Sequence, residues 1–306
     1  MAKQDLKNMP VSVHNRLMNL VKAGNLDPNR TFTLYAIERL LFRLSKSGYR
    51  DQFILKGAML FAVWDIRIHR PTQDMDLLGK GDISTESIRK TFIKILETPV
   101  EPDGLMFETG SIAIEDIRAE DEYVGKRIRL LARLGTARIS LQVDIGLGDA
   151  ASIPFKLEKF PTLLPFPPPE ILTYPREPAI AEKFQAMVSL GMRNSRMKDY
   201  FDIWTLSNHF SFDGDILRNA LKATFSRRNT PVLAELPIGL TAEFGEAPDK
   251  QAQWKGFLRR IGAKEDKHFP EIVKDISAFL SPVVNSIVTE KQFNFQWNPK
   301  GPWRKV

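Results

Sequence analysis

The sequence predicts an α+β protein, in which a small mixed α/β core precedes a mainly helical region. The predicted elements after the first helices run strand, helix, strand, helix and then three strands. This order is typical of a small mixed core rather than a doubly wound sheet. Residues 158–178 are rich in proline, which predicts a linker or a strap between the two regions. Beyond it, apolar residues recur mainly at helical spacing.

These patterns place a domain boundary near residues 155–175. We therefore expect N-terminal helices over residues 1–48, the mixed core over 49–157, and a helical C-terminal domain over 176–306.

The N-terminal region predicts one helix over residues 10–24 and a longer one over 30–47. In the longer helix, leucine and isoleucine recur on one side. The other, polar side carries Glu38, Arg39 and Arg43, and we expect an ordinary packing helix.

The core begins with an apolar strand at 53–55, a glycine turn at Gly57 and a buried helix over 58–66. A strand at 74–78 and an amphipathic helix at 84–97 come next. Two alternating stretches, 105–117 and 123–134, predict a pair of strands, and a final strand contains Asp144. On the second of the pair, three arginines share a face, which is either solvated or a basic wall for phosphates: Arg127, Arg129 and Arg133.

Asp74 and Asp76 are the most informative residues of the core. Successive side chains of a strand point to opposite faces, so both aspartates point one way while Met75 turns into the core. Asp144 lies on the polar face of its own alternating strand. If the two strands are neighbours, three carboxylates share one face and repel one another unless a cation neutralises them. Hard oxygen ligands suit Mg²⁺, which usually serves phosphate chemistry.

The Asp-x-Asp pattern also occurs by chance, often in a solvated turn, so the pattern alone is weak. The preceding glycine turn and apolar helix, together with the later strand acid, favour the metal-site interpretation over the solvated turn.

The helical region predicts helices near 178–191, 196–209, 214–224, 249–261 and 270–281. Lys183 lies beside an apolar stripe, where it either extends to water or binds a phosphate as a compact charge. Asp199 and Asp202 share a helical face, and Ser195 is the expected N-cap. These acids form either a functional site or an ordinary ion-pair surface with Arg196 and Lys198.

Composition narrows the classes of function. The chain has 306 residues and a net charge of +7, which weakly favours anionic partners such as nucleotides or nucleic acid. It has no cysteine, which excludes disulfides and thiolate chemistry and is compatible with a reducing compartment. With no signal peptide or membrane span apparent, we expect a cytoplasmic protein that does not act on a membrane.

The sequence resembles the AbiEii/AbiGii family of nucleotidyltransferase toxins, found in type IV toxin–antitoxin or abortive-infection systems. The resemblance covers roughly residues 30–210 and rests on three separated motifs. These are Lys56-Gly57-Ala58-Met59-Leu60 with Arg70-Pro71-Thr72-Gln73-Asp74-Met75-Asp76, then Ala181-Glu182-Lys183-Phe184-Gln185-Ala186, and finally Arg196-Met197-Lys198-Asp199-Tyr200-Phe201-Asp202-Ile203-Trp204.

The resemblance implies a DNA polymerase β-like nucleotidyltransferase core with a mixed sheet, followed by a helical domain. It implies that Asp74 and Asp76 bind Mg²⁺ with the nucleoside triphosphate, and that Asp144 matches the superfamily's third acid. It further implies a role for Lys183 at the phosphates and an essential role for Asp199 or Asp202. The remaining nucleotide contacts that it implies are Lys56, Gly57, Ala58, Arg70, Thr72 and Arg196. The superfamily has Gly or Ser after the first glycine, so Ala58 removes a phosphate-binding hydroxyl.

These implications lead us to expect a Mg²⁺-dependent enzyme that transfers a nucleoside monophosphate from an NTP and releases pyrophosphate. By family similarity, the acceptor is the 3′ end of tRNA or another RNA, and an antitoxin from the adjacent gene is the cognate partner, with or without direct contact. Two alternatives stay open: a decayed nucleotide- or RNA-binding protein, and a metal-dependent phosphoesterase.

Overall fold

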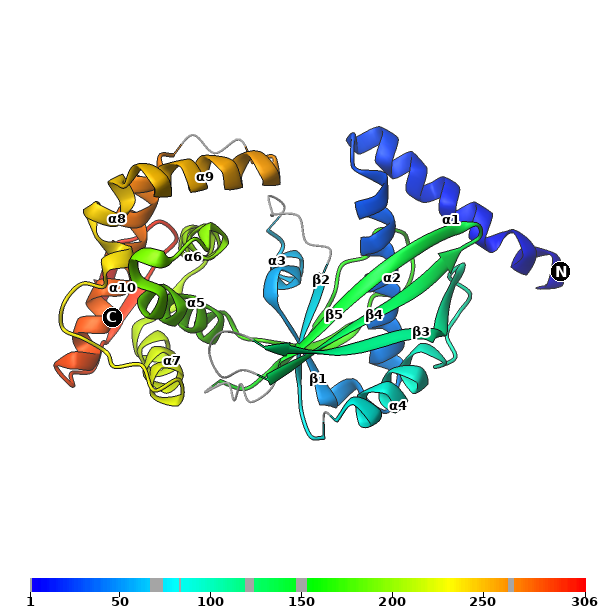
Figure 1. Ribbon diagram of the computed structural model, residues 1–306, viewed down its shortest axis with the longest axis horizontal. Helices are drawn as coiled ribbons and strands as arrows, with labels where there is room; N and C mark the ends of the chain where they lie inside the picture. The colour runs from blue at the N-terminus through cyan, green and yellow to red at the C-terminus, as the bar shows by residue number, and fades with distance from the viewer. Residues whose placement is uncertain (1, 67–73, 83, 119–123, 147–152, 264–266) are drawn as a thin grey trace. The chain divides into compact units, whose positions relative to one another are not determined.

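The structure is a computed structural model that describes residues 2–66, 74–82, 84–118, 124–146, 153–263 and 267–306 (Figure 1). The chain forms two compact units, Met1–Ala150 with Phe155–Tyr174, and Ala151–Pro154 with Pro175–Val306. No helix among the described residues is both long and apolar enough to cross a membrane.

The first unit contains a mixed seven-stranded sheet in the order β3-β4-β5-β2-β1-β7-β6. Strand β2 lies between β1, which is antiparallel to it, and β5, which is parallel to it. The mixed sheet confirms the predicted fold class. Its strands are β1 (Phe53–Lys56), β2 (Asp74–Gly79), β3 (Leu105–Arg118), β4 (Val124–Leu134), β5 (Ala137–Gly146), β6 (Lys156–Lys159) and β7 (Glu170–Thr173).

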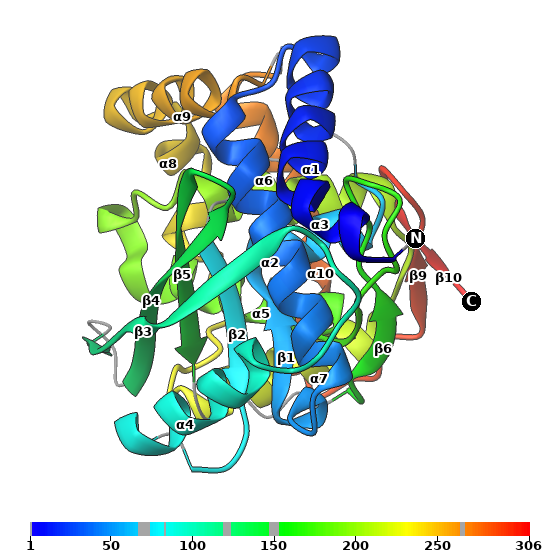
Figure 2. The same ribbon diagram turned by 90° about the vertical axis from the view of Figure 1, so that its right-hand side faces the viewer.

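Helices α2 (Pro28–Lys46) and α4 (Thr85–Leu96) pack on one face of this sheet, and α1 (Ala2–Gly24) lies along α2 (Figure 2). Asp27 caps α2 by accepting a hydrogen bond from the backbone of Arg30, and Ser84 caps α4 in the same way. The predicted helix over 58–66 is wrong in length: a 3₁₀ turn at Gly57–Met59 leads into α3, which spans only Leu60–Val63.

The proline-rich segment is not a simple linker. Its ends form β6 and β7, and β7 adds to the sheet parallel to β1. Between them the chain returns over α2, where the backbone amide of Leu163 donates to Glu38 at 2.7 Å and Arg39 donates to the carbonyl of Pro167 at 3.1 Å. The segment is therefore a strap that covers the outer side of α2.

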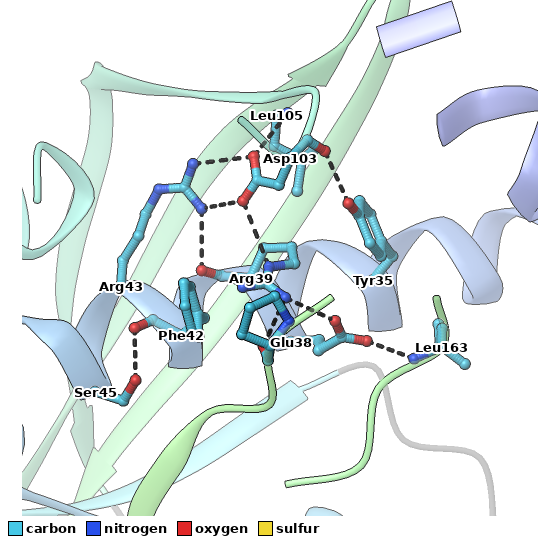
Figure 3. A network of polar contacts seen from close by, with 10 residues as sticks. Tyr35, Glu38, Arg39, Phe42, Arg43, Ser45, Asp103, Leu105 and Leu163 are labelled. Atoms are coloured by element: carbon cyan, nitrogen blue, oxygen red, sulfur yellow. Dashed lines mark hydrogen bonds and ion pairs between the residues drawn. The ribbon is translucent and has the colours of Figure 1, made fainter. Parts of the chain in front are cut away.

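This strap buries the polar side of α2. Glu38 and Arg39 are each 1% exposed, and Arg43 is also buried. Arg43 makes a two-point ion pair with buried Asp103, and Arg39 lies near both Glu38 and Asp103 (Figure 3). Tyr35 donates to the carbonyl of Asp103 at 2.7 Å. Buried charges are tolerated here because each finds an opposite charge or a backbone partner.

The second unit is mainly helical, with a small three-stranded sheet in the order β10-β9-β8. Phe279 stacks on Trp303 and meets Trp297 edge to face, so the aromatic carboxyl terminus packs into this unit. Its elements are α5 (Arg176–Leu190), α6 (Met197–His209), β8 (Phe212–Asp213), α7 (Gly214–Arg227), α8 (Ala242–Glu246), α9 (Pro248–Ile261), α10 (Phe269–Val288), β9 (Phe295–Trp297) and β10 (Trp303–Lys305).

We expect Glu38 to lower the free energy of unfolding as the pH rises. Burial raises the pKa of the Glu38 carboxyl from 4.5 to about 7. Between these values the folded protein keeps a proton on Glu38 that the unfolded chain has released, so the contribution of this carboxyl to stability is greatest below about pH 4.5 and is lost as the pH rises to about 7. Between about pH 4.5 and pH 7, the free energy of unfolding of the wild type should fall by on the order of 2 kcal/mol more than that of Glu38→Gln, measured by urea unfolding.

The exposed Glu101→Gln variant is the matched control, and it should follow the wild type at every pH. Equal pH dependence in wild type and Glu38→Gln would contradict this prediction.

Candidate active site

Strand β2 places its two aspartates on the polar face of the sheet. Met75 and Leu77 are 1% and 2% exposed, whereas Asp74 is exposed and Asp76 is half-buried. In the parallel pairing with β5, Asp76 stands opposite Asp144 and Asp74 stands opposite Gln142. The structure therefore brings the three sequence-predicted carboxylates to neighbouring positions of one face.

The register extends this arrangement into a row of charges across five strands. Lys56 of β1 is opposite Asp76, Asp76 is opposite Asp144, Asp144 is opposite Arg127 of β4, and Arg127 is opposite Glu115 of β3. Residues directly opposite each other point to the same face. The two central carboxylates are thus flanked by a cation on each side, which offsets their mutual repulsion. We call this set the charged row.

Gly57 brings the backbone against the carboxylate of Asp76. The glycine has a φ of +68°, and a Cβ at this position would lie 1.9 Å from Oδ2 of Asp76. Only glycine satisfies both the backbone angle and the close approach. Ala58 is 2% exposed, so its methyl group packs in the core.

Lys56, at the end of the charged row, is half-buried. Its ammonium group lies over the ring of Tyr174, 4.3 Å from the centroid, which is a cation–π contact. Tyr174 also donates its backbone amide to the carbonyl of Leu55, so β7 and the residue that follows it hold this part of β1. Arg70 and Thr72, the other two nucleotide contacts predicted from this motif, lie outside the described residues.

Arg127 binds Asp144 through two parallel hydrogen bonds. Its Nε and Nη2 donate to Oδ1 and Oδ2 at 2.8 and 2.7 Å. These bonds raise the pKa of the Arg127 guanidinium above its usual range, and the negative charges of Glu115 and Asp74 act in the same direction. The alternation of β4 predicted Arg127 on this face, but its pairing with Asp144 was missed because it depends on the register between β4 and β5.

The other two arginines of the predicted basic wall also have acidic partners. Arg129 pairs with Glu115 at 2.9 Å, and Arg133 pairs with Glu108. The face is therefore a ladder of ion pairs between β3, β4 and β5.

Asp144 is poorly placed to ligate a divalent cation in the conformation described. Mg²⁺ is typically held by one or two carboxylates together with substrate phosphates. Both oxygens of Asp144 already accept hydrogen bonds from Arg127. Accordingly, no group of three or more His, Cys, Asp or Glu side chains within the described ranges has the arrangement of a metal site.

The second unit contains a separate cluster around Lys183 of α5. The ammonium group donates to Asp202 at 2.7 Å and to Asp199 at 3.2 Å, and Arg196 donates to Asp199 at 2.6 Å. Both aspartates are 0% exposed, whereas the Lys183 side chain is 16% exposed. Two buried carboxylates on one face of α6 therefore orient one lysine.

The predicted Ser195 cap is wrong. The N-cap of α6 is Arg196, whose backbone amide bonds to the side chain of Asn194 rather than to a serine hydroxyl. Asn194 is fully buried and Ser195 is exposed, so the buried amide replaces the hydroxyl at this turn.

We expect Gly57→Ala to destabilise the protein by about 1–3 kcal/mol, because alanine is strained at positive φ and its methyl group displaces Asp76. Gly110→Ala is the matched control, since an added Cβ there meets nothing within 4 Å. Urea unfolding measures the difference. Equal stability of the two variants would show that Asp76 does not require this close approach.

Lys183→Met should destabilise the protein by on the order of 3 kcal/mol, because it leaves two buried carboxylates without their shared cation. The exposed Lys222→Met variant is the control. Adding Asp199→Asn and Asp202→Asn to Lys183→Met should recover part of the loss in thermal unfolding. If the triple variant is no more stable than Lys183→Met, the cluster is not coupled as the distances indicate.

Comparison with known proteins gives the family. The model of the nucleotidyl transferase AbiEii toxins of type IV toxin–antitoxin systems matches residues 39–280. No curated protein matches the chain. Two Helicobacter pylori crystal structures resemble it at 13% identity. JHP933 has a TM-score of 0.49, with 87% of this chain and 96% of that chain covered. A candidate nucleotidyltransferase has a TM-score of 0.50, with 88% and 100% covered.

At this level of identity the second structure supports the fold alone, and it agrees with the predicted nucleotidyltransferase-type fold. The family match spans most of the chain and includes the aspartate motif and both motifs of the second unit. The chain therefore belongs to the AbiEii nucleotidyltransferase toxin family of type IV toxin–antitoxin systems.

Proposed function

We propose that this toxin transfers a nucleoside monophosphate from an NTP to the 3′ end of tRNA and releases pyrophosphate. The observation that carries the proposal is the pair Asp74 and Asp76, which share the polar face of β2 beside the close turn at Gly57. The family supports nucleotidyl transfer by a toxin. The RNA acceptor, and the cytoplasm as the place where the toxin meets it, are parts of the proposal.

Asp74 and Asp76 would hold Mg²⁺, since both present carboxylate oxygens on one face. When bound, the cation would neutralise charge on the triphosphate and on the leaving pyrophosphate. Lys56, opposite Asp76, adds a positive charge to the same face. These residues bind and orient the triphosphate for in-line attack by the acceptor hydroxyl.

Asp144 is the proposed third acid, either as a further ligand or as the acceptor of the attacking hydroxyl's proton. In the conformation described, its oxygens are bound by Arg127, so either role requires Arg127 to release it. Lys183 is the proposed phosphate contact of the second unit. There, Asp199 and Asp202 are proposed to act by holding its ammonium group in place rather than by touching the reacting atoms.

A binding role without chemistry is the second candidate, and the Arg127–Asp144 pair is the observation that favours it. A carboxylate that stays in this ion pair can neither ligate a cation nor accept a proton. A phosphoesterase that activates water at the same carboxylates is the third possibility, and the products separate all three.

The test is incubation of the protein with each labelled NTP, Mg²⁺ and total RNA. Label that enters RNA, mapped to the 3′ end of tRNA, supports the proposal. Release of free phosphate would support hydrolysis, and bound but unreacted NTP would support a binding protein.

Asp76→Asn should reduce the labelling of RNA by roughly 100-fold or more, because it removes a charge that the triphosphate site requires. Asp51→Asn in the same unit is the matched control, since that side chain is 74% exposed, and it should label RNA at the wild-type rate. Labelling by Asp76→Asn at the wild-type rate would reject the site assignment.

A further inference from the structure

The pairing of Arg127 with Asp144 differs from the other ion pairs on its strand. Arg129 and Arg133 pair with acids of β3, on the side away from β2. Arg127 instead pairs with the acid that stands next to Asp76. The pair is partly accessible, with side-chain exposures of 29% for Arg127 and 21% for Asp144, so water and ions can reach it.

The geometry of this pair occupies the carboxylate fully. A guanidinium that binds both oxygens of one carboxylate is a planar two-point match, which is stronger and more directional than a single contact. Without Arg127, the carboxylate of Asp144 would lose the counter-ion that binds both its oxygens, and a divalent cation would be a natural replacement. Arg127 thus takes the electrostatic place of a cation at Asp144.

We propose that Arg127 is a built-in counter-ion that keeps Asp144 from ligating a divalent cation in the nucleotide-free protein. The proposal rests on the proposed function in that it takes Asp74 and Asp76 as the cation site. Arg127 is then a positioning residue. In the nucleotide-free protein, the site binds a divalent cation through two carboxylates rather than three.

The test is direct measurement of Mn²⁺ binding by the nucleotide-free full-length protein, using electron paramagnetic resonance. Arg127→Gln should bind Mn²⁺ roughly tenfold more tightly than the wild type, because a third carboxylate becomes available. Asp144→Asn alone should leave Mn²⁺ affinity within about twofold of the wild type, because that carboxylate contributes no ligand while Arg127 holds it.

The double variant Arg127→Gln/Asp144→Asn isolates the coupling. It should lose the tenfold gain of Arg127→Gln, since the gain depends on the freed carboxylate. Arg129→Gln is the matched control, because it removes an arginine from the same face whose partner is Glu115, and it should bind Mn²⁺ as the wild type does.

Thermal unfolding with and without Mn²⁺ provides a second measurement that also reports folding. Mn²⁺ should raise the melting temperature of Arg127→Gln more than that of the wild type, because tighter binding to the folded state stabilises it more. If Arg127→Gln is unstable, Arg127→Lys keeps the charge but loses the two-point geometry, and it should show a smaller gain in Mn²⁺ affinity.

The inference is overturned if Arg127→Gln binds Mn²⁺ no more tightly than the wild type, or if Asp144→Asn alone weakens binding tenfold. Neither readout requires catalysis. The expected Mn²⁺ affinities without any labelling of RNA would support this inference and contradict the proposed transfer activity. Labelling of RNA without these affinities would support the transfer activity and contradict this inference.

Discussion

The candidate site depends on the register of β2 between β1 and β5. Because side chains alternate along a strand, a slip of one residue would turn Asp74 and Asp76 into the core and bring Met75 to the polar face. The hydrogen bonds on both sides of β2 prevent such a slip, since Asp76 is paired with Lys56 on one side and with Asp144 on the other. The buried Met75 and Leu77 oppose it as well. The charged row is thus a consequence of backbone pairing and core packing together.

Contacts on the opposite face of the sheet, around α2, also help to hold β1 in place. Helix α2 is covered by the strap, and Glu38 and Arg39 tie the strap to the helix through backbone groups. The same segment supplies β7, which pairs with β1 immediately before the Gly57 turn. A polar network inside the first unit therefore helps to hold the strand that carries Lys56, although none of its members lies on the charged row.

The sequence predicted what local periodicity can determine. The alternation around Asp76 and Asp144, the long strands of the β3–β4 pair and most helices follow from spacing along the chain. The two strands at the ends of the strap were missed because β6 and β7 are four residues each and are bordered by prolines, so their pairing depends on a distant strand. Burial of Arg39 could not be predicted because helical spacing does not reveal that another segment returns over the polar side. The position of the Arg127–Asp144 pair beside Asp76 depends on the registers of β4 with β5 and of β5 with β2, and no single window of sequence contains these registers.

The cluster around Lys183 changes how loss of an acidic residue should be interpreted in this protein. Asp199 and Asp202 both bind the same ammonium group, so removing either one alters the position and the charge balance of Lys183. Arg196 also binds Asp199. If Asp202 is lost, Lys183 keeps Asp199, a carboxylate that it shares with Arg196. If Asp199 is lost, Lys183 keeps Asp202, to which Arg196 does not bind in the pairs described. An acid can therefore be essential for activity without touching substrate. Distinguishing the two roles requires asking whether the effect of each aspartate persists once Lys183 is gone, because a positioning residue has nothing left to position.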